Sequence, residues 1–289
     1  MGIRSAGEVA THRHSVALTM ERPEILAPFL KWAGGKRWFV HARPDLLRVH
    51  EERYIEPFMG SGAVYFHLQP SRAQLSDTNR DLIATYQAIK SDWRRVLSEL
   101  SGYANRHSAE NYYLARGVRS GDVYVEAARF IYLNRTCWNG LYRVNRKGEF
   151  NVPIGTKTNI LLPNDDFERI ARLLDSADLH HRDFEVAIDD AMEDDFLFVD
   201  PPYTVKHNLN GFLKYNENIF SWDDQVRLRD ALIRADARGA RVLMTNADHE
   251  SIRELYDGIF WLEPIARNSV LAGTGGTRGR VTELLIRNW

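Results

Sequence analysis

The sequence has almost no cysteine. Cys137 is the only one in 289 residues, so the chain can form neither an internal disulfide nor a cysteine-rich zinc site. Such a composition is typical of a reducing compartment, and we expect a cytoplasmic protein. No apolar run approaches the ~20 residues of a membrane span, and the N-terminus lacks the apolar core of a signal peptide. We expect neither a membrane nor a metal as partner.

The chain also lacks a net charge of either sign. Lys and Arg total 38 against 39 Asp and Glu, so whole-chain charge does not indicate a polyanionic partner. Internal repeats and low-complexity tracts are absent. With 44% hydrophobic residues, the chain can bury the core of one large domain, or of one domain with an insertion.

A third absence concerns nucleotide-binding fingerprints. Tyr54 to Gly62, followed by Ala63 to Leu68, predicts a strand, a glycine turn and a helix, as in the first unit of a nucleotide-binding sheet. Only Gly60 and Gly62 are present and no Walker lysine follows, which argues against nicotinamide and ATP. Asp77 ends a second apolar stretch, where a carboxylate can bind both ribose hydroxyls; it could also cap the following helix.

Phe196 to Tyr203 is the most informative stretch. Four apolar residues predict a strand buried on both faces of an α/β sheet, and Asp200 to Tyr203 would then stand at the rim of the crevice. Pro201 and Pro202 stiffen this rim and leave carbonyls free to accept hydrogen bonds. A carboxylate, a carbonyl and the Tyr203 ring suit a planar base with an exocyclic amine. A proline-stiffened turn with a packed tyrosine is the alternative.

The loop from Pro28 to Arg37 combines glycines with cations. Gly34 and Gly35 let the backbone approach a ligand closely, and Lys31 and Lys36 flank Trp32, whose indole could cover a ring.

Positive charge gathers between Arg129 and Ile160. Six cations stand there against Glu149 alone, a net charge of +5, interleaved with aromatic and amide side chains. Arg146 to Glu149, between two β-prone runs, predicts a hairpin. This combination suits phosphate contact with base readout, although a solvated basic hairpin has the same composition. The six cations are Arg129, Arg135, Arg143, Arg146, Lys147 and Lys157.

These stretches together resemble the Dam-type DNA adenine-N6 methyltransferases (alpha group, D12 class), from about Phe29 to the C-terminus. The shared motifs are Phe-Leu-Lys-Trp-Ala-Gly-Gly-Lys at 29–36, Glu-Pro-Phe-x-Gly-x-Gly at 56–62, Asp-x-Asn at 77–79 and Asp-Pro-Pro-Tyr at 200–203. The resemblance implies a Rossmann-like α/β sheet that binds S-adenosyl-L-methionine. It implies cofactor contacts for Trp32, Ala33, Gly34, Lys36, Glu56, Phe58, Gly60, Gly62, Asp77, Asp183 and Phe184, and catalytic roles for Asp200, Pro201, Pro202 and Tyr203.

Asn-Gly-Leu-x-Arg-x-Asn at 139–145 and Gly-x-Phe-Asn-Val-Pro-x-Gly at 148–155 resemble the DNA-recognition region of the same enzymes. The resemblance implies that Arg143 reads a guanine edge, that Leu141 and Pro153 make apolar base contacts, and that Trp138 and Asn139 enter the duplex. The family often has Tyr at the position of Trp138. The residues implied to contact DNA are Lys31, Trp138, Asn139, Leu141, Arg143, Asn145, Arg146, Lys147 and Pro153.

We therefore expect a catalytic domain of residues 25–90 and 164–289, a flexible leader of residues 1–24, and an insertion at 91–163 that is mostly helical and ends in a β-hairpin. Predicted helices include Trp93 to Leu100, Asp122 to Cys137, one capped by Asn164, and one from a Ser221–Asp224 capping box. Predicted later strands are 241–246, 261–265 and 283–286. Thr204 to Asn218 is typical of a lid or an ordinary loop.

The expected activity is methyl transfer to N6 of a flipped adenine in double-stranded DNA, at a short GATC-like site, by a monomer. The alternatives are an amino methyltransferase acting on cytosine N4, RNA or a protein glutamine, and a DNA-binding module that has lost turnover.

Overall fold

The computed structural model describes residues 26–47, 53–140, 142–145, 148–206, 220–268 and 280–289. The expected leader, Leu141, Arg146, Lys147 and most of the lid segment lie outside these residues. Within the described part, no helix combines the length and the apolar character needed to cross a membrane.

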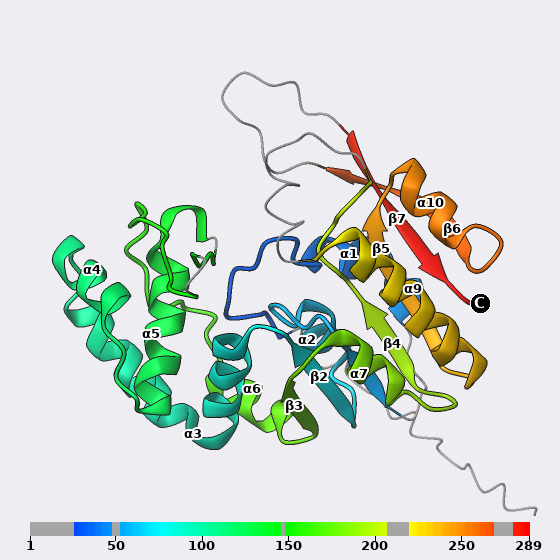
Figure 1. The fold of residues 1–289 in the computed structure, drawn as a ribbon. Coiled ribbons are helices and arrows are strands. Elements are labelled where there is room, and N and C mark those ends of the chain that lie inside the picture. Colours follow the sequence, from blue (N-terminus) through cyan, green and yellow to red (C-terminus); the bar gives the residue numbers. More distant parts are fainter. Residues whose placement is uncertain (1–25, 48–52, 141, 146–147, 207–219, 269–279) are drawn as a thin grey trace, which may run out of the picture.

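Seven strands of the described residues form one sheet in the order β3-β2-β1-β4-β5-β7-β6 (Figure 1). The first five strands along this order are parallel, β7 is antiparallel to β5, and β6 is antiparallel to β7. The strands are β1 (Tyr54–Glu56), β2 (Ala73–Asp77), β3 (Ala177–His181), β4 (Phe196–Val199), β5 (Arg241–Ala247), β6 (Trp261–Asn268) and β7 (Arg280–Arg287). This is the Rossmann-like α/β sheet that the sequence predicts.

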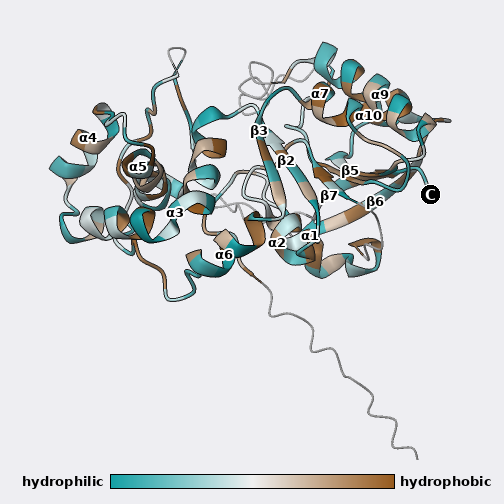
Figure 2. Ribbon diagram, turned by 90° about the horizontal axis from the view of Figure 1, so that it is seen from below, coloured by the Kyte–Doolittle hydropathy of each residue, from teal (hydrophilic) through white to brown (hydrophobic). Residues whose placement is uncertain are grey.

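Helices cover both faces of the sheet. Successive side chains of a strand point to opposite faces, so an apolar strand contributes to a core on each side. In β4, Phe196 and Phe198 belong to one core, and Leu197 and Val199 to the other. The second core contains residues of α7 (Phe184–Asp189), α9 (Trp222–Ala237) and α10 (Glu250–Tyr256). The first contains residues of α1 (Arg37–Ala42), η1 (Pro44–Leu47), α2 (Ala63–Leu68) and α6 (Phe167–Leu174). Hydrophobic residues gather on the strands and on the helix sides turned toward them (Figure 2).

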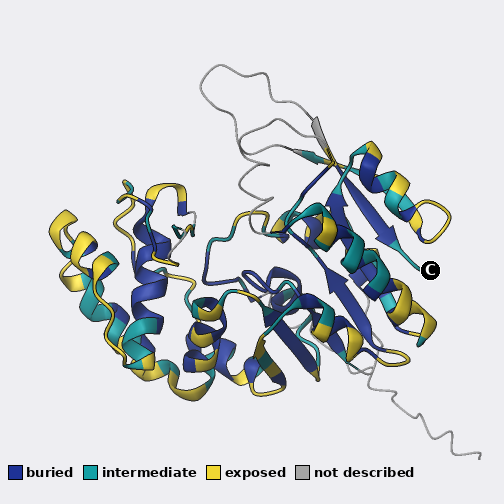
Figure 3. Cartoon of the chain, in the orientation of Figure 1, coloured by how far each residue is buried: buried dark blue, intermediate teal, exposed yellow. Residues whose placement is uncertain are grey.

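The insertion is helical, as predicted, and packs beside the sheet (Figure 1). It comprises the part of α3 (Arg80–Asn105) that follows residue 90, α4 (Ala109–Gly117), α5 (Val123–Thr136) and η2 (Trp138–Gly140). Because α3 kinks at Asp92, one helix leaves the sheet and enters the insertion. The core of the insertion is continuous with one core of the sheet. Helix α5 is buried along most of its length (Figure 3).

Local signals predicted several boundaries. Asp122 caps α5, and Ser221 with Asp224 forms the capping box of α9. The predicted cap of α6 at Asn164 is wrong: Asp166 accepts the hydrogen bond from Arg169 N. Both side chains are good caps, and the chain begins its helix at the one directly before Phe167. Helix α4 and edge strand β3 are not among the predicted elements.

Candidate active site

Asp200 lies at the carboxyl end of β4, as the apolar run before it predicts. Its Oδ1 accepts a hydrogen bond from the Thr245 hydroxyl at 2.7 Å and lies 2.8 Å from Lys36 Nζ. Lys36 Nζ also donates to the carbonyl of Gly34 at 2.9 Å. Among the described residues, Oδ2 of Asp200 has no hydrogen-bond partner. One carboxylate oxygen is therefore fixed by the protein, and the other remains available to a ligand.

Tyr203 lies three residues further along the proline-stiffened rim. Its hydroxyl donates to Glu283 Oε2 on β7 at 2.7 Å. Lys36 Nζ lies 4.9 Å from the centroid of the Tyr203 ring, within the range of a cation–π contact. Lys36 thus contacts both ends of the Asp-Pro-Pro-Tyr motif and links it to the glycine loop at 34–35.

Three carboxyl groups lie at the ends of β1, β2 and β4. Burial raises the pKa of the Asp200 carboxyl, although the Lys36 ammonium opposes the shift. Burial raises the pKa of Glu56 well above its ordinary value, and the charges of Asp200 and Asp77 add to that rise. Burial also raises the pKa of Asp77. The charges of Asp77 and Asp200 thus act on the pKa of Glu56. A cationic ligand beside these three carboxyl groups would favour their charged forms.

The glycine turn is tied to the end of β2. Asp77 Oδ2 accepts from Gly60 N at 3.0 Å, and Asp77 Oδ1 accepts from Asn79 N at 2.9 Å. The cap of α3 is Asn79, so Asp77 is not the cap. Gly60 has φ +49, and a Cβ there would lie 2.7 Å from Trp32 Cδ1. The turn at 60–62 and the loop at 32–36 therefore touch, and only glycine fits between them.

Aromatic rings line the side of the site near α7. Phe58 stacks on Phe184 at 5.3 Å between centroids, and Phe220 contacts both rings. Asp183 caps α7 and accepts from Arg227 at 2.9 Å, while the Arg227 guanidinium lies over Phe184. The structure thus brings together Phe58 and the Asp183–Phe184 pair, which are more than 100 residues apart in the sequence.

The insertion is attached directly to the loop at 31–36. The Asn134 side chain accepts from Lys31 N at 2.9 Å and donates to Lys31 O at 2.8 Å. Trp32 stacks on Tyr142 at 5.6 Å between centroids. The predicted hairpin is present as a bridge between Val144 and Phe150, and its turn residues Arg146 and Lys147 lie outside the described part.

Most of the side chains predicted to contact DNA are exposed where the structure describes them, and Asn145 is half-buried. Trp138 is 54% exposed, and Asn139 has a left-handed φ of 58. Arg143 Nε donates to Asn151 at 3.1 Å, and Asn145 Nδ2 donates to Glu149 at 2.9 Å. Pro153 is exposed, and its carbonyl accepts from Trp138 N. Leu141 lies outside the described residues.

Two of the six cations of the basic segment are buried. Arg129 is buried and binds Glu126 and the carbonyl of Ala115. Arg135 is buried and binds Asp165 through two hydrogen bonds. The net charge of +5 counted along the sequence is therefore not all at the surface, because these two guanidinium groups are used inside the protein.

Three polar residues of the site were not predicted, namely Thr245, Glu283 and Arg267. Thr245 holds Asp200, while Glu283 binds Tyr203 and also accepts from Arg267 at 2.8 Å. A weak signal exists for Glu283, since a lone acid opens the otherwise apolar stretch at 283–286. Thr245 is an ordinary strand residue and carries no such signal.

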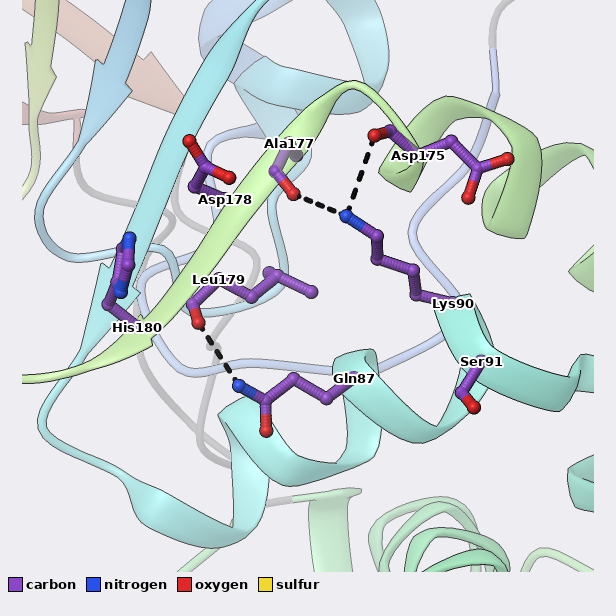
Figure 4. Close-up of a pocket in the computed structure, with 8 residues that line it drawn as sticks. All are labelled: Gln87, Lys90, Ser91, Asp175, Ala177, Asp178, Leu179 and His180. Atoms are coloured by element: carbon purple, nitrogen blue, oxygen red, sulfur yellow. Dashed lines mark hydrogen bonds between the residues drawn. The ribbon is translucent and has the colours of Figure 1, made fainter.

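A surface groove of about 440 Å³ lies between α3 and edge strand β3 (Figure 4). Lys90 Nζ donates to the carbonyl of Ala177 at 2.8 Å, and Gln87 donates to the carbonyl of Leu179 at 3.1 Å. These side chains occupy carbonyls that an exposed edge strand would offer to another chain. The groove protects a sheet edge and contains none of the predicted site residues.

Among the described residues, no three His, Cys, Asp or Glu side chains are grouped as a metal site would require.

A Rossmann-like sheet with an antiparallel β7, and with Asp-Pro-Pro-Tyr beside a glycine turn, defines the class as methyltransferase. Residues 32–270 match the family model described as D12 class N6 adenine-specific DNA methyltransferase. The chain therefore belongs to this family and is an adenine-N6 DNA methyltransferase.

Relatives span nearly the whole chain. The Type II methyltransferase M1.LlaDCHI of Lactococcus lactis subsp. cremoris is 34% identical, over 91% of this chain and 96% of its own. The DNA N-6-adenine-methyltransferase of Escherichia phage P1 is 35% identical, over 91% of this chain and 35% of its own. The DNA adenine methylase of Escherichia coli K12 is 32% identical, over 89% of this chain and 93% of its own.

Proposed function

We propose that this protein transfers the methyl group of S-adenosyl-L-methionine to N6 of an adenine flipped out of double-stranded DNA at a short GATC-like site. The observation that carries this is the arrangement of Asp200, whose Oδ1 is held by Thr245 and Lys36 while Oδ2 faces no described donor. An amine with two N–H groups needs two acceptors. Oδ2 and the carbonyl of Pro201 are the two that the motif offers.

The catalytic work is positioning. A base inside a duplex cannot reach a buried cofactor, so adenine must flip out, at a cost of a few kcal/mol. Asp200 and the carbonyl of Pro201 accept hydrogen bonds from the two amine N–H groups and raise the electron density on N6. Pro202 keeps the rim extended, and Tyr203 stacks on the base, which is worth roughly 1–3 kcal/mol. Holding the amine in line with the methyl group supplies most of the rate.

The cofactor fits the residues around the glycine turn. We assign Trp32, Ala33, Gly34, Lys36, Gly60 and Gly62 to the loops against it, and Glu56 and Asp77 to its polar contacts. Phe58, Asp183 and Phe184 line the pocket for its adenine. S-adenosyl-L-methionine supplies a methyl group activated on a positively charged sulfur. The three carboxylates whose pKa values are raised by burial suit a ligand of that charge.

DNA recognition is assigned to the insertion at 91–163 and to Lys31, with residues 25–90 and 164–289 as the catalytic domain. Arg143 reads a guanine and Pro153 makes an apolar contact, while Trp138 and Asn139 enter the duplex. Asn145 supports the hairpin through Glu149. Leu141, Arg146 and Lys147 keep the roles expected from the sequence. We propose that the protein acts as a cytoplasmic monomer without a metal.

The test is methylation of unmodified plasmid by the purified protein, followed by nucleoside mass measurement and modification-sensitive sequencing. We expect N6-methyladenine in a four-base site. Asp200→Asn should slow single-turnover methylation by roughly 10²–10³, with cofactor binding retained, because the amine loses a charged acceptor. Asp178→Asn, on the exposed edge strand β3, is the matched control. N4-methylcytosine, methylated RNA, or cofactor binding without any transfer would each contradict the proposal.

A further inference from the structure

Glu283 is a buried carboxylate that the proposed mechanism does not use. It lies on β7 opposite Ala247 of β5, and only 2% of its surface is exposed. A carboxylate in such a place is strongly disfavoured unless donors surround it. Three donors do so. The Tyr203 hydroxyl lies at 2.7 Å from Oε2, Arg267 Nη1 at 2.8 Å from Oε1, and Lys36 Nζ at 3.5 Å from Oε2.

Two of these donors belong to the site itself. The Tyr203 hydroxyl is the polar end of the ring that stacks on the base, and the torsion that turns a tyrosine ring is soft. The hydroxyl oxygen lies on the axis of that torsion, so a hydrogen bond there fixes the direction in which the ring points, while packing against the ring faces sets its plane. Lys36 is shared, since its ammonium lies 2.8 Å from Asp200 Oδ1 and 3.5 Å from Glu283 Oε2. Without Glu283, Lys36 would have Asp200 as its remaining acid partner here.

Two neighbouring strands hold the motif. Thr245 on β5 binds Asp200 and also contacts Tyr203, and Glu283 on the adjacent β7 binds Tyr203. The two strands are hydrogen-bonded in register from Leu243–Arg287 to Ala247–Glu283. Both ends of the Asp-Pro-Pro-Tyr motif are therefore attached to one rigid β-ladder.

We propose that Glu283 is a positioning residue of methyl transfer, which holds the Tyr203 ring and the Lys36 ammonium so that the flipped adenine meets a fixed stacking face beside Asp200 Oδ2. This inference rests on the proposed roles of Asp200 and Tyr203. Glu283 acts through Tyr203 and Lys36 and does not touch the base.

The experiment compares Glu283→Ala and Glu283→Gln with Tyr203→Phe and with the double variant Glu283→Ala/Tyr203→Phe. The matched control is Glu263→Gln on the neighbouring β6, where the carboxylate binds Arg43 at 2.6 Å. The readouts are the single-turnover methylation rate, KM for cofactor and DNA, and fluorescence of 2-aminopurine placed at the target adenine. Gln keeps an acceptor oxygen for the phenol, so it also serves if the Ala variant does not fold.

We expect Glu283→Ala to lower the single-turnover rate by roughly 10- to 100-fold, with both KM values nearly unchanged, because the reacting groups lose alignment. Glu283→Gln should lose less. The 2-aminopurine signal should rise above wild type, because a loose ring quenches the flipped base less. Tyr203→Phe should add little loss in the Glu283→Ala background, since the hydrogen bond between Tyr203 and Glu283 is already absent there.

The outcomes distinguish a failure of the inference about Glu283 from a failure of the proposed function. If Tyr203→Phe is impaired while both Glu283 variants behave like Glu263→Gln, the role of Glu283 is overturned and the proposed function stands. Full additivity of the two changes, or a loss of stability alone, would also overturn it. If Tyr203→Phe has wild-type rate and fluorescence, the hydroxyl bond to Glu283 is not needed and the inference fails, whereas the stacking role, which the Phe ring retains, stands.

Discussion

The two halves of the basic segment from 129 to 160 use the same kind of residue for opposite purposes. In α5, the Arg135 side chain is 2% exposed and binds the carboxylate of Asp165, the carbonyl of Phe29 and the carbonyl of Ile160. In the hairpin, Arg143 is exposed, and the one hydrogen bond described for its guanidinium goes to Asn151. The first guanidinium is committed to the fold, whereas the second can exchange its partner for a base.

Under the proposed function, Arg135 holds the recognition surface in place, whereas Arg143 makes the contact with DNA. Arg135 joins α5, the loop at Phe29 and the segment at 160–165, so it fixes where the hairpin leaves the catalytic domain. Arg143 then needs few contacts of its own. Positive charge that contacts DNA must stay hydrated in the free protein, because desolvating it in advance would cost free energy without a phosphate to offset it.

The largest expected effect comes from breaking the buried half. Arg135→Met should lower the free energy of unfolding by about 3–5 kcal/mol, because the Asp165 side chain, 9% exposed, loses its charged partner and keeps only the backbone donor of Leu162. Chemical denaturation at pH 7 measures the change. Arg143→Met, which removes an exposed guanidinium from the same segment, is the control and should be near neutral. Similar losses for the two variants would show that the halves do not differ as described.

Composition could not distinguish these arginines. The strand ends, the glycine turn and the capping boxes were predictable because each rests on a local pattern: an apolar run before Asp200, two glycines after Glu56, a serine three residues before Asp224. The direction of the Arg135 side chain depends on Asp165, which is 30 residues away and reaches it only after folding. Glu283 and Thr245 were missed for the same reason, since strand order brings them to Tyr203 and Asp200.

The role of the exposed half is tested by measuring how well the protein discriminates between DNA sequences. Arg143→Ala should cost roughly 1–3 kcal/mol of discrimination at one guanine of the target, with a smaller loss on unrelated duplexes. Competition between cognate duplexes and duplexes substituted at single positions measures the difference. Lys157→Ala, which removes an exposed cation without a predicted base contact, should weaken binding to all sequences alike. Equal losses on cognate and scrambled DNA for Arg143→Ala would remove its assignment as a base reader.

Lys31 lies where the two halves meet, and its surroundings in the free protein disfavour the charged form of its amine. Burial lowers its pKa to about 8, and the neighbouring Lys157 adds to the shift. The folded pKa lies below the unfolded value, so the penalty of charging Lys31 is fully present below about pH 8 and relieved as the pH rises above it.

A DNA phosphate beside Lys31 would reverse that balance. Binding would then take up a proton above about pH 8, and affinity for DNA should fall by about tenfold at most between pH 7 and 9. Fluorescence anisotropy with a labelled duplex at constant ionic strength measures this slope in the wild type and in Lys31→Met. The variant should show a flatter pH dependence, because Cys137 and Lys157 remain and only the Lys31 amine is gone. Parallel slopes in the two proteins would mean that Lys31 does not meet a phosphate, and its assignment to the DNA interface would be wrong.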